Sequence, residues 1–183
     1  MSEENQYDLV VVGGGPAGSS AAWSAAKNGI NVALIEKENS IAETVRTSGV
    51  TWIQSIKEFG IPENCYNPIK NFTFCSPNNE ITIKDSIPRA AVLDVRKTYR
   101  WLAKEAENAG ADIFIKTSIN GVIKNDNGDI VGVSGVGPKG EITFHSKMII
   151  DASGFSSTIC KAMGFVTQWE RFGAGAEWEV KVE

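Results

Sequence analysis

Three glycines near the amino terminus have the spacing that lets a peptide backbone hold a phosphate group. Gly13, Gly15 and Gly18 follow an apolar run at residues 9–12 in the order G-x-G-x-x-G. The first glycine permits the turn from strand to helix, the second lets backbone approach a pyrophosphate, and the third allows close packing. The amino end of the helix adds free N–H groups and partial positive charge. The spacing therefore predicts a site for a dinucleotide.

The residues around these glycines supply the helix, strand and acid that such a site requires. Pro16 and Ala17 begin an alanine-rich stretch, and a proline in the first helical turn loses no hydrogen bond. A second apolar strand is expected at 30–35, with Glu36 at its carboxyl end and Lys37 after it. The Glu36 carboxylate can accept hydrogen bonds from both ribose hydroxyls of an adenosine, and it would repel the 2′-phosphate of NADP. All four residues are candidates for cofactor binding.

The composition is that of an ordinary globular protein. The chain has 183 residues, of which 42% are hydrophobic and 22% charged, with a formal net charge of −4. The few basic residues are dispersed, which argues against nucleic acid as a partner. No run of about twenty apolar residues occurs, and the polar, acidic amino terminus is unlike a signal peptide. We therefore expect a cytoplasmic protein.

The cysteines and the single histidine give no support to metal or hydrolytic chemistry. Cys65, Cys75 and Cys160 lack metal-binding or redox spacing and are expected to be reduced thiols. His145 lies within a strand pattern, where a structural role is the expectation. No metal site is predicted, and no side chain is singled out as a catalytic acid or base.

The rest of the chain alternates between helix and strand patterns. Residues 62–68 are expected to form a loop. The expected elements are a helix at 51–59, hairpin strands at 72–74 and 81–83 around Pro77-Asn78-Asn79, a strand at 90–95, a helix at 97–109 and a strand at 112–115. Further on, they are a three-stranded antiparallel meander at 119–124, 130–136 and 141–145, a separate buried strand at 148–150, a short helix at 156–163 and a strand at 173–182.

The predicted fold class is α/β, with a Rossmann-like dinucleotide-binding domain that combines a parallel sheet with the antiparallel meander. The hairpin interrupts the nucleotide-binding pattern and suggests the beginning of a second, β-rich substrate domain. We therefore expect a discontinuous binding domain at 1–60 and 90–165, with partial substrate-domain strands at 61–89 and 166–183.

Four features together resemble one group of flavoproteins. These are the glycine motif with Pro16, Ala17 and Glu36, the stretch Arg46-Thr47-Ser48-Gly49, the block from Val92 to Asp112, and the segment from Ile149 to Ser157. The chain resembles the amino-terminal portion of geranylgeranyl reductase-type flavoproteins, within the larger group that includes aromatic hydroxylases and electron-transfer-flavoprotein dehydrogenases. The resemblance implies FAD as the cofactor.

The resemblance also implies roles for residues beyond the glycine motif. The stretch at 46–48 (Arg46, Thr47, Ser48) would lie toward the flavin, although the reductases often carry a Cys-Gly pair there. Arg96 would reach the cofactor from a strand-to-helix turn, one position later than the family's arginine. The backbone near Ile119 would pass the adenine side. The family's second motif usually has an aspartate at position 153; here the acid is Asp151, which would orient Arg96 or bind cofactor through water, and Gly154 would form a tight turn.

The function that the resemblance implies is reduction of isoprenoid double bonds in prenyl lipids by flavin hydride, with an external electron donor. The complete enzyme would then sit peripherally on a membrane. The family ordinarily continues for about as many residues again, with a Gly-Asp motif that these residues lack. The chain is therefore expected to be a fragment, a truncated reading frame or half of a split protein.

Two alternatives remain open from the sequence. One is a flavin-dependent monooxygenase or halogenase-like enzyme, which would share the same glycine motif and meander. The other is a non-catalytic dinucleotide-binding half that needs a partner chain to supply the carboxyl-terminal half. Such a half should expose apolar surface, for which the candidates are Phe72, Phe74, Trp169, Phe172 and Trp178.

Overall fold

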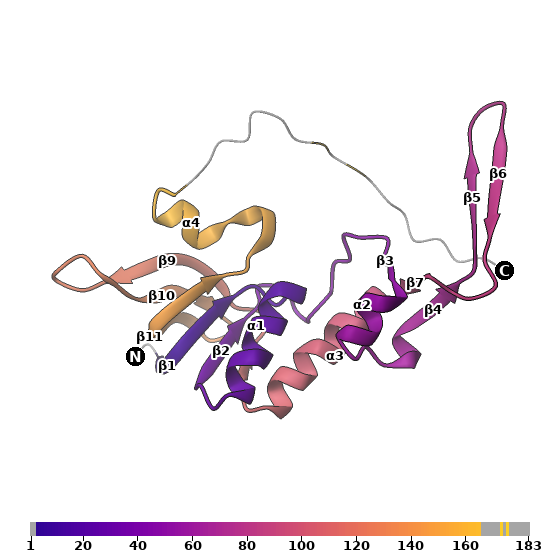
Figure 1. The fold of residues 1–183 in the computed structure, drawn as a ribbon. Helices are drawn as coiled ribbons and strands as arrows, with labels where there is room; N and C mark the ends of the chain where they lie inside the picture. The colour runs from indigo at the N-terminus through magenta and orange to yellow at the C-terminus, as the bar shows by residue number, and fades with distance from the viewer. Residues whose placement is uncertain (1–2, 166–172, 174, 176–183) are drawn as a thin grey trace. The chain divides into compact units, whose positions relative to one another are not determined.

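The computed structural model describes residues 3–165 together with residues 173 and 175. The chain divides into two compact units (Figure 1). The first comprises the described residues of Met1–Thr44 and Tyr99–Gly173, and the second those of Val45–Thr98 and Ala174–Glu183. The predicted domain limits, 1–60 with 90–165 and 61–89 with 166–183, divide the chain at other positions and stay a prediction for functional domains.

The first unit is built on a six-stranded sheet with the order β8-β2-β1-β11-β10-β9. Strands β8, β2, β1 and β11 run parallel to their neighbours, whereas β11, β10 and β9 form an antiparallel meander. The strands are β1 (Glu3–Val12), β2 (Val32–Ile35), β8 (Asp112–Phe114), β9 (Ser118–Lys124), β10 (Ile130–Gly137) and β11 (Gly140–Asp151). This arrangement confirms the predicted fold class of a Rossmann-like α/β domain with a parallel sheet and a meander.

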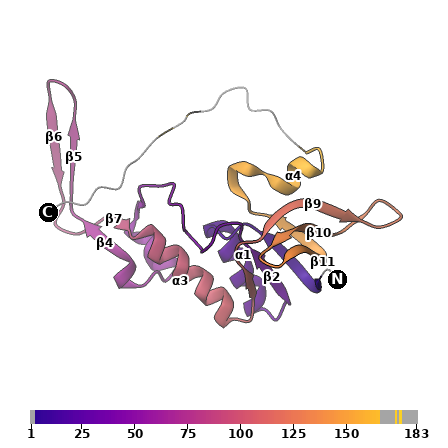
Figure 2. The same ribbon diagram turned by 180° about the vertical axis from the view of Figure 1, so that it is seen from behind.

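The two faces of this sheet bury different sets of side chains because side chains alternate along a strand. Leu9 and Val11 of β1 pack in one cluster with small residues such as Ala22 and Ala106. These alanines belong to helices α1 (Pro16–Lys27) and α3 (Val95–Asn108). Val10 and Val12 of β1 pack in a second cluster on the other face, together with Phe144, Val133, Ile119 and Ile159. Figure 2 shows the meander from behind.

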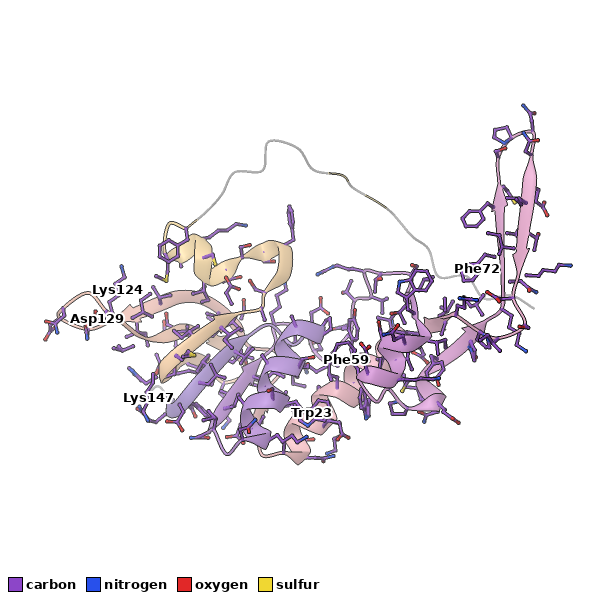
Figure 3. All side chains as sticks on the ribbon, in the orientation of Figure 1. Trp23, Phe59, Phe72, Lys124, Asp129 and Lys147 are labelled. Atoms are coloured by element: carbon purple, nitrogen blue, oxygen red, sulfur yellow. The ribbon has the colours of Figure 1, made fainter. Side chains whose placement is uncertain are left out.

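Strand β11 corrects one prediction. The pattern predicts two strands, at 141–145 and 148–150, whereas the structure has one strand whose first half also pairs with β10. The polar pair Ser146-Lys147 does not break it, because Lys147 points to solvent (Figure 3). The Nζ atom of Lys147 lies 2.6 Å from Oδ1 of Asp8 on β1. The short helix predicted at 156–163 is found as the 3₁₀ turn Gly154–Ser156 and α4 (Thr158–Ala162).

The second unit contains a three-stranded sheet with the order β3-β7-β4, formed by β3 (Val50–Trp52), β7 (Ala90–Leu93) and β4 (Tyr66–Ile69). Helix α2 (Ile53–Glu58) and the 3₁₀ turn Glu63–Cys65 connect the strands. The loop predicted at 62–68 is therefore partly wrong, because β4 begins at Tyr66. Pro68 masked this strand in the sequence, but a proline is tolerated there because β4 is an edge strand. The helix predicted at 51–59 is shorter, since Thr51 and Trp52 pair with β7.

The predicted hairpin is confirmed as β5 (Asn71–Cys75) and β6 (Glu80–Lys84), which form a separate two-stranded sheet. The chain reverses between them at Ser76, whose N–H donates to the Asn79 carbonyl at 2.7 Å. The strand predicted at 173–182 lies outside the described residues, apart from Gly173 and Gly175. Among the helices that the structure describes, none is long and apolar enough to cross a membrane.

Candidate dinucleotide-binding site

The glycine turn joins β1 to α1, and two of its glycines are required by packing inside the protein. Gly13 has a φ of +112°, and a Cβ atom there would collide with the carbonyl oxygen of Ala152. A Cβ atom on Gly18 would collide with the carbonyl oxygen of Gly13. These contacts bring the start of α1 against the end of β1, as the predicted motif requires.

Gly15 differs from these two glycines because nothing in the structure requires its small size. It is the residue before the first turn of α1, with a φ of −70° that any residue can adopt. A Cβ atom there would meet no atom of the described residues within 4 Å. It places no side-chain cap on α1, and the helix continues with Pro16. The bare backbone at Gly15 therefore faces open space at a helix amino terminus, the environment that suits a diphosphate.

Glu36 follows β2 and lies over the glycine turn. One carboxylate oxygen, Oε2, accepts the backbone N–H of Gly14 at 2.7 Å, and the other, Oε1, accepts that of Glu38 at 2.9 Å. Each carboxylate oxygen can accept a further hydrogen bond. The acid is thus fixed in orientation beside the turn and keeps acceptor capacity for sugar hydroxyls. Gly14 was not singled out from the sequence; its only signal was its place within the run of three glycines.

The segment after Glu36 is held beside the turn by contacts that the sequence did not indicate. A Cβ atom on Gly14 would collide with the side chain of Ile41, which is buried. Arg100 of α3 donates from Nε to the Ile41 carbonyl at 3.2 Å and from Nη2 to the Ser40 hydroxyl at 3.4 Å. Lys37 is exposed in this segment. Arg100 looks in the sequence like any solvent-exposed helix cation, so no pattern would have found it.

Two predicted flavin-side segments lie together within the second unit. Gly49 has a φ of +76°, and a Cβ atom there would lie 2.8 Å from both the Leu93 carbonyl oxygen and Cγ2 of Val95. The Leu93 N–H donates to the Gly49 carbonyl at 2.9 Å. The exposed residues Arg46, Thr47 and Ser48 therefore precede a glycine that is pressed against the junction of β7 and α3.

Arg96 lies in the first turn of α3, which begins one residue after Asp94. The Asp94 carboxylate caps this helix by accepting the Lys97 N–H at 3.0 Å. The strand predicted at 90–95 thus ends at Leu93, and Arg96 is half-buried on the helix. Contact of Arg96 and of the 46–48 stretch with cofactor stays a prediction.

Ile119 and the second motif lie in the first unit with the glycine turn. Ile119 is buried in β9 opposite Gly135, so only its backbone is open to the role predicted for it. Gly154 has a φ of +64°, as a tight turn requires. Asp151 ends β11, and its carboxylate accepts bonds from Ser153 N–H and hydroxyl and from the N–H groups of Ile159 and Cys160. These four donors come from the loop after β11 and from the first turn of α4, and cofactor contact by Asp151 stays a prediction.

Burial and hydrogen bonding act in opposite directions on the Asp151 carboxyl. Partial burial favours the protonated form, whereas the bonds from Ser153 and Cys160 favour the ionised form. The hydrogen bonds prevail and hold the pKa of Asp151 below its usual value. The group is therefore ionised at neutral pH.

The geometry of the first unit fits the adenosine diphosphate part of a dinucleotide, and comparison with known proteins identifies which one. The family described as FAD binding domain matches residues 6–180. An uncharacterized protein from the nifH2 5′ region of Methanosarcina barkeri is 36% identical over 177 residues, which cover 90% of this chain and 91% of that protein.

Longer relatives match over part of their length. The digeranylgeranylglycerophospholipid reductase of Methanocaldococcus jannaschii is 36% identical over 169 residues, 90% of this chain but 42% of the reductase. A solved geranylgeranyl bacteriochlorophyll reductase-like protein of Thermoplasma acidophilum has a TM-score of 0.79 and 31% identity, over 88% of this chain and 43% of that one. A flavin-dependent brominase at 24% identity, with a TM-score of 0.69 over 87% of this chain and 41% of that one, shares the fold.

These matches confirm the resemblance to geranylgeranyl reductase-type flavoproteins that the motifs indicated. The chain spans about two fifths of the length of the reductases and nearly the whole of the Methanosarcina protein. The glycine turn, the acid after β2 and the meander all fall within the matched residues 6–180. The chain therefore belongs to the FAD-binding domain family, and its cofactor is FAD.

Proposed function

We propose that this chain is the FAD-holding module of a reductase that acts on the isoprenoid double bonds of prenyl lipids. When bound, FAD supplies the hydride for this reduction, and an external electron donor restores the reduced flavin. The support is the relationship to digeranylgeranylglycerophospholipid reductases over 90% of the chain. A prenyl-lipid substrate would place the complete enzyme at a membrane surface as a peripheral protein.

The residues of the chain bind and orient the cofactor in this proposal. The backbone at Gly15 and the start of α1 hold the diphosphate, and Glu36 accepts hydrogen bonds from the adenosine ribose. Arg46, Thr47 and Ser48, with Arg96, lie toward the flavin. No side chain is assigned as a catalytic acid or base.

Gly15 is the observation that carries the binding proposal. Within the described part of the chain a Cβ atom there meets nothing within 4 Å, and the backbone is not strained, so packing does not account for a glycine. The approach of a ligand to the backbone does account for it.

A matched pair of variants tests whether the diphosphate binds at Gly15. Gly15→Val places a branched side chain where the diphosphate would lie, whereas Ser20→Val adds similar bulk on an exposed position of α1. We expect Gly15→Val to lose the visible flavin spectrum after reconstitution with FAD, while its far-ultraviolet circular dichroism and the flavin content of Ser20→Val stay as in wild type. Full flavin content in Gly15→Val would contradict the proposal.

The prenyl-lipid part of the proposal needs its own measurement. Reconstituted protein should be reduced by dithionite and then mixed anaerobically with a geranylgeranyl lipid in detergent. Reoxidation of the flavin with formation of a saturated isoprenoid bond supports the reductase assignment. Reoxidation that requires molecular oxygen, with hydroxylation of an aromatic compound, would support a monooxygenase instead.

We also infer that a further polypeptide, corresponding to the remaining part of the longer reductases, covers one face of the β5–β6 hairpin. The register pairs Phe72 with Ile83 and Phe74 with Ile81, which places all four side chains on the same face. Phe74, Ile81 and Ile83 are 59%, 63% and 52% exposed. A lone two-stranded hairpin is marginally stable in water, so an apolar cover would stabilise it.

Complex formation tests this second inference. Size-exclusion chromatography with light scattering should show a complex when the chain is mixed with the product of the coding sequence directly downstream. Ile81→Ser should weaken that complex, whereas Thr73→Ser, on the opposite face of the hairpin, should leave it intact. A complex unaffected by Ile81→Ser would mean that another surface carries the contact.

A further inference from the structure

The loop after β11 is packed directly against the glycine turn. The Ala152 N–H donates to the Val12 carbonyl at 2.8 Å. A Cβ atom on Gly13 would collide with the Ala152 carbonyl and lie 2.9 Å from the Ser153 nitrogen. A Cβ atom on Gly18 would lie 3.2 Å from the Ala152 side chain. Ala152 therefore forms one wall of the turn that receives the diphosphate.

Asp151 fixes both ends of the loop that carries Ala152. Its Oδ1 accepts the Ser153 N–H at 3.1 Å and the Ser153 hydroxyl at 2.6 Å. Its Oδ2 accepts the N–H groups of Ile159 and Cys160, both at 2.9 Å. The Ser153 hydroxyl in turn accepts the Thr158 N–H at 2.8 Å. The carboxylate thus joins the residue after Ala152 to the first turn of α4.

This bonding pattern leaves the Asp151 carboxylate little capacity for any other partner. A carboxylate has about four acceptor positions. Ser153 and the first turn of α4 supply four N–H and O–H donors, and the Cys160 thiol also bonds to the carboxylate. A direct bond from Asp151 to the cofactor would require one of these donors to be displaced. The contribution of Asp151 to binding is therefore expected to pass through the protein backbone.

We propose that Asp151 is a positioning residue for FAD, which fixes Ala152 against Gly13 and so holds the glycine turn in the shape that accepts the diphosphate. This inference rests on FAD binding by the chain and adds a residue that has no contact with the cofactor. The negative charge matters because all four partners are hydrogen-bond donors. An asparagine would turn its own NH₂ group toward two of them, and neither could then be satisfied.

Asp151→Asn is the variant that tests the inference, with Asp112→Asn as its matched control. Asp112 also holds a structural hydrogen bond, from the Tyr7 hydroxyl at 2.8 Å, but it begins β8 and is not one of the residues that contact Asp151 or Ala152 as described above. We expect Asp151→Asn to weaken the Kd for FAD by at least about tenfold, the loss that corresponds to one charge-assisted hydrogen bond. Asp112→Asn should lower the unfolding temperature and leave the Kd unchanged.

Hydrogen exchange of the flavin-free protein gives a readout that is independent of binding. The hydrogen-bonded amides of Gly13 and Gly14 should exchange faster in Asp151→Asn than in wild type, and at the wild-type rate in Asp112→Asn. If Asp151→Asn fails to fold, Ser153→Ala removes one donor to Oδ1 and the acceptor for Thr158 N–H. It should show the same two effects at smaller size.

The outcomes separate this inference from the assignment of the cofactor. A wild-type chain that takes up no FAD would overturn FAD binding by the isolated chain, and the exchange rates would still show whether Asp151 holds the turn. Wild-type affinity and exchange in Asp151→Asn and Ser153→Ala would overturn the positioning role. Equal losses of affinity in Asp151→Asn and Asp112→Asn would also overturn it, because they would reflect general instability.

Discussion

The glycine turn of the first unit and the β5–β6 hairpin of the second differ in how far contacts within the protein cover them. Gly13 and Gly18 are enclosed by backbone and by Ala152, and the adjacent Glu36 carboxylate has a hydrogen bond on each oxygen. The hairpin instead presents Phe74 and Ile81 to solvent. The turn is complete except for the space at Gly15, which suits a small ligand, whereas Phe74, Ile81 and Ile83 on one face of the hairpin are each more than half exposed. Under the two proposals made above, the turn would therefore receive a small molecule and the hairpin a polypeptide.

The largest effect on stability is expected for a substitution in the enclosed glycine turn. Gly18→Ala introduces a Cβ atom that would collide with the Gly13 carbonyl oxygen. Because this oxygen belongs to the backbone, no side-chain rotation can relieve the collision. We expect the free energy of unfolding to fall by about 3 kcal/mol, the upper part of the range for overpacking. Gly15→Ala should cost no stability, since its Cβ has open space. Urea denaturation of the two flavin-free variants measures the difference, and equal stabilities would contradict the packing described here.

A smaller effect concerns binding alone. Glu36→Ala removes the acceptor proposed for the ribose and the bond to the Gly14 N–H. The Kd for FAD should rise about tenfold, as expected for the loss of a hydrogen bond to a charged group. Isothermal titration calorimetry measures it. Glu107→Ala, which breaks the exposed Lys104–Glu107 pair on α3, serves as the control and should bind FAD as wild type does.

A pH experiment sharpens the account of the turn. The pKa of Asp151 is lowered in the folded protein, so its stabilising contribution is present above the unfolded pKa of about 4 and is lost as pH falls through the folded value. The facing Cys160 thiol does not interfere, because its bond to Asp151 raises the pKa of the thiol. The stability difference between wild type and Asp151→Asn should therefore stay constant from pH 7 to about pH 5 and shrink as pH falls below about 4. A constant difference would show that the carboxylate charge is not what stabilises the loop.

A small effect on stability is expected for a substitution in the hairpin. Phe74→Ser replaces a side chain that is 59% exposed, and surface substitutions usually change stability by less than about 0.5 kcal/mol. The binding of a fluorescent apolar dye to the isolated chain should nevertheless decrease, because the apolar face becomes smaller. A large loss of stability in Phe74→Ser would show that the hairpin face is already covered within this chain.

The sequence predicts well what depends on local pattern. The elements from β1 through α1 to Glu36 can be predicted because glycine spacing, a first-turn proline and apolar strands each have a local physical cause. The hairpin is readable for the same reason, since apolar residues alternate on either side of Pro77-Asn78-Asn79.

What the sequence does not reveal depends on the neighbours that the fold supplies. Strand β4 contains Pro68, which is acceptable only because β4 is an edge strand. Ser146 and Lys147 look like the end of a strand until β1 provides Asp8 as a partner. The hydrogen bonds of Arg100 to Ile41 and of Asp151 to Cys160 join different elements, and no spacing in the sequence predicts them.

The continuity of β11 has a consequence for how this protein can vary. One uninterrupted strand connects the meander turn at Gly140 to Asp151, in register with β1 from Glu3 to Val12. Adding or deleting a single residue in it would turn every later side chain to the opposite side of the sheet. The carboxylate would then face away from the loop it now holds. The number of residues in β11 thus fixes the side of the sheet that Asp151 faces. Insertions and deletions should be tolerated at the meander turns and not within the strand.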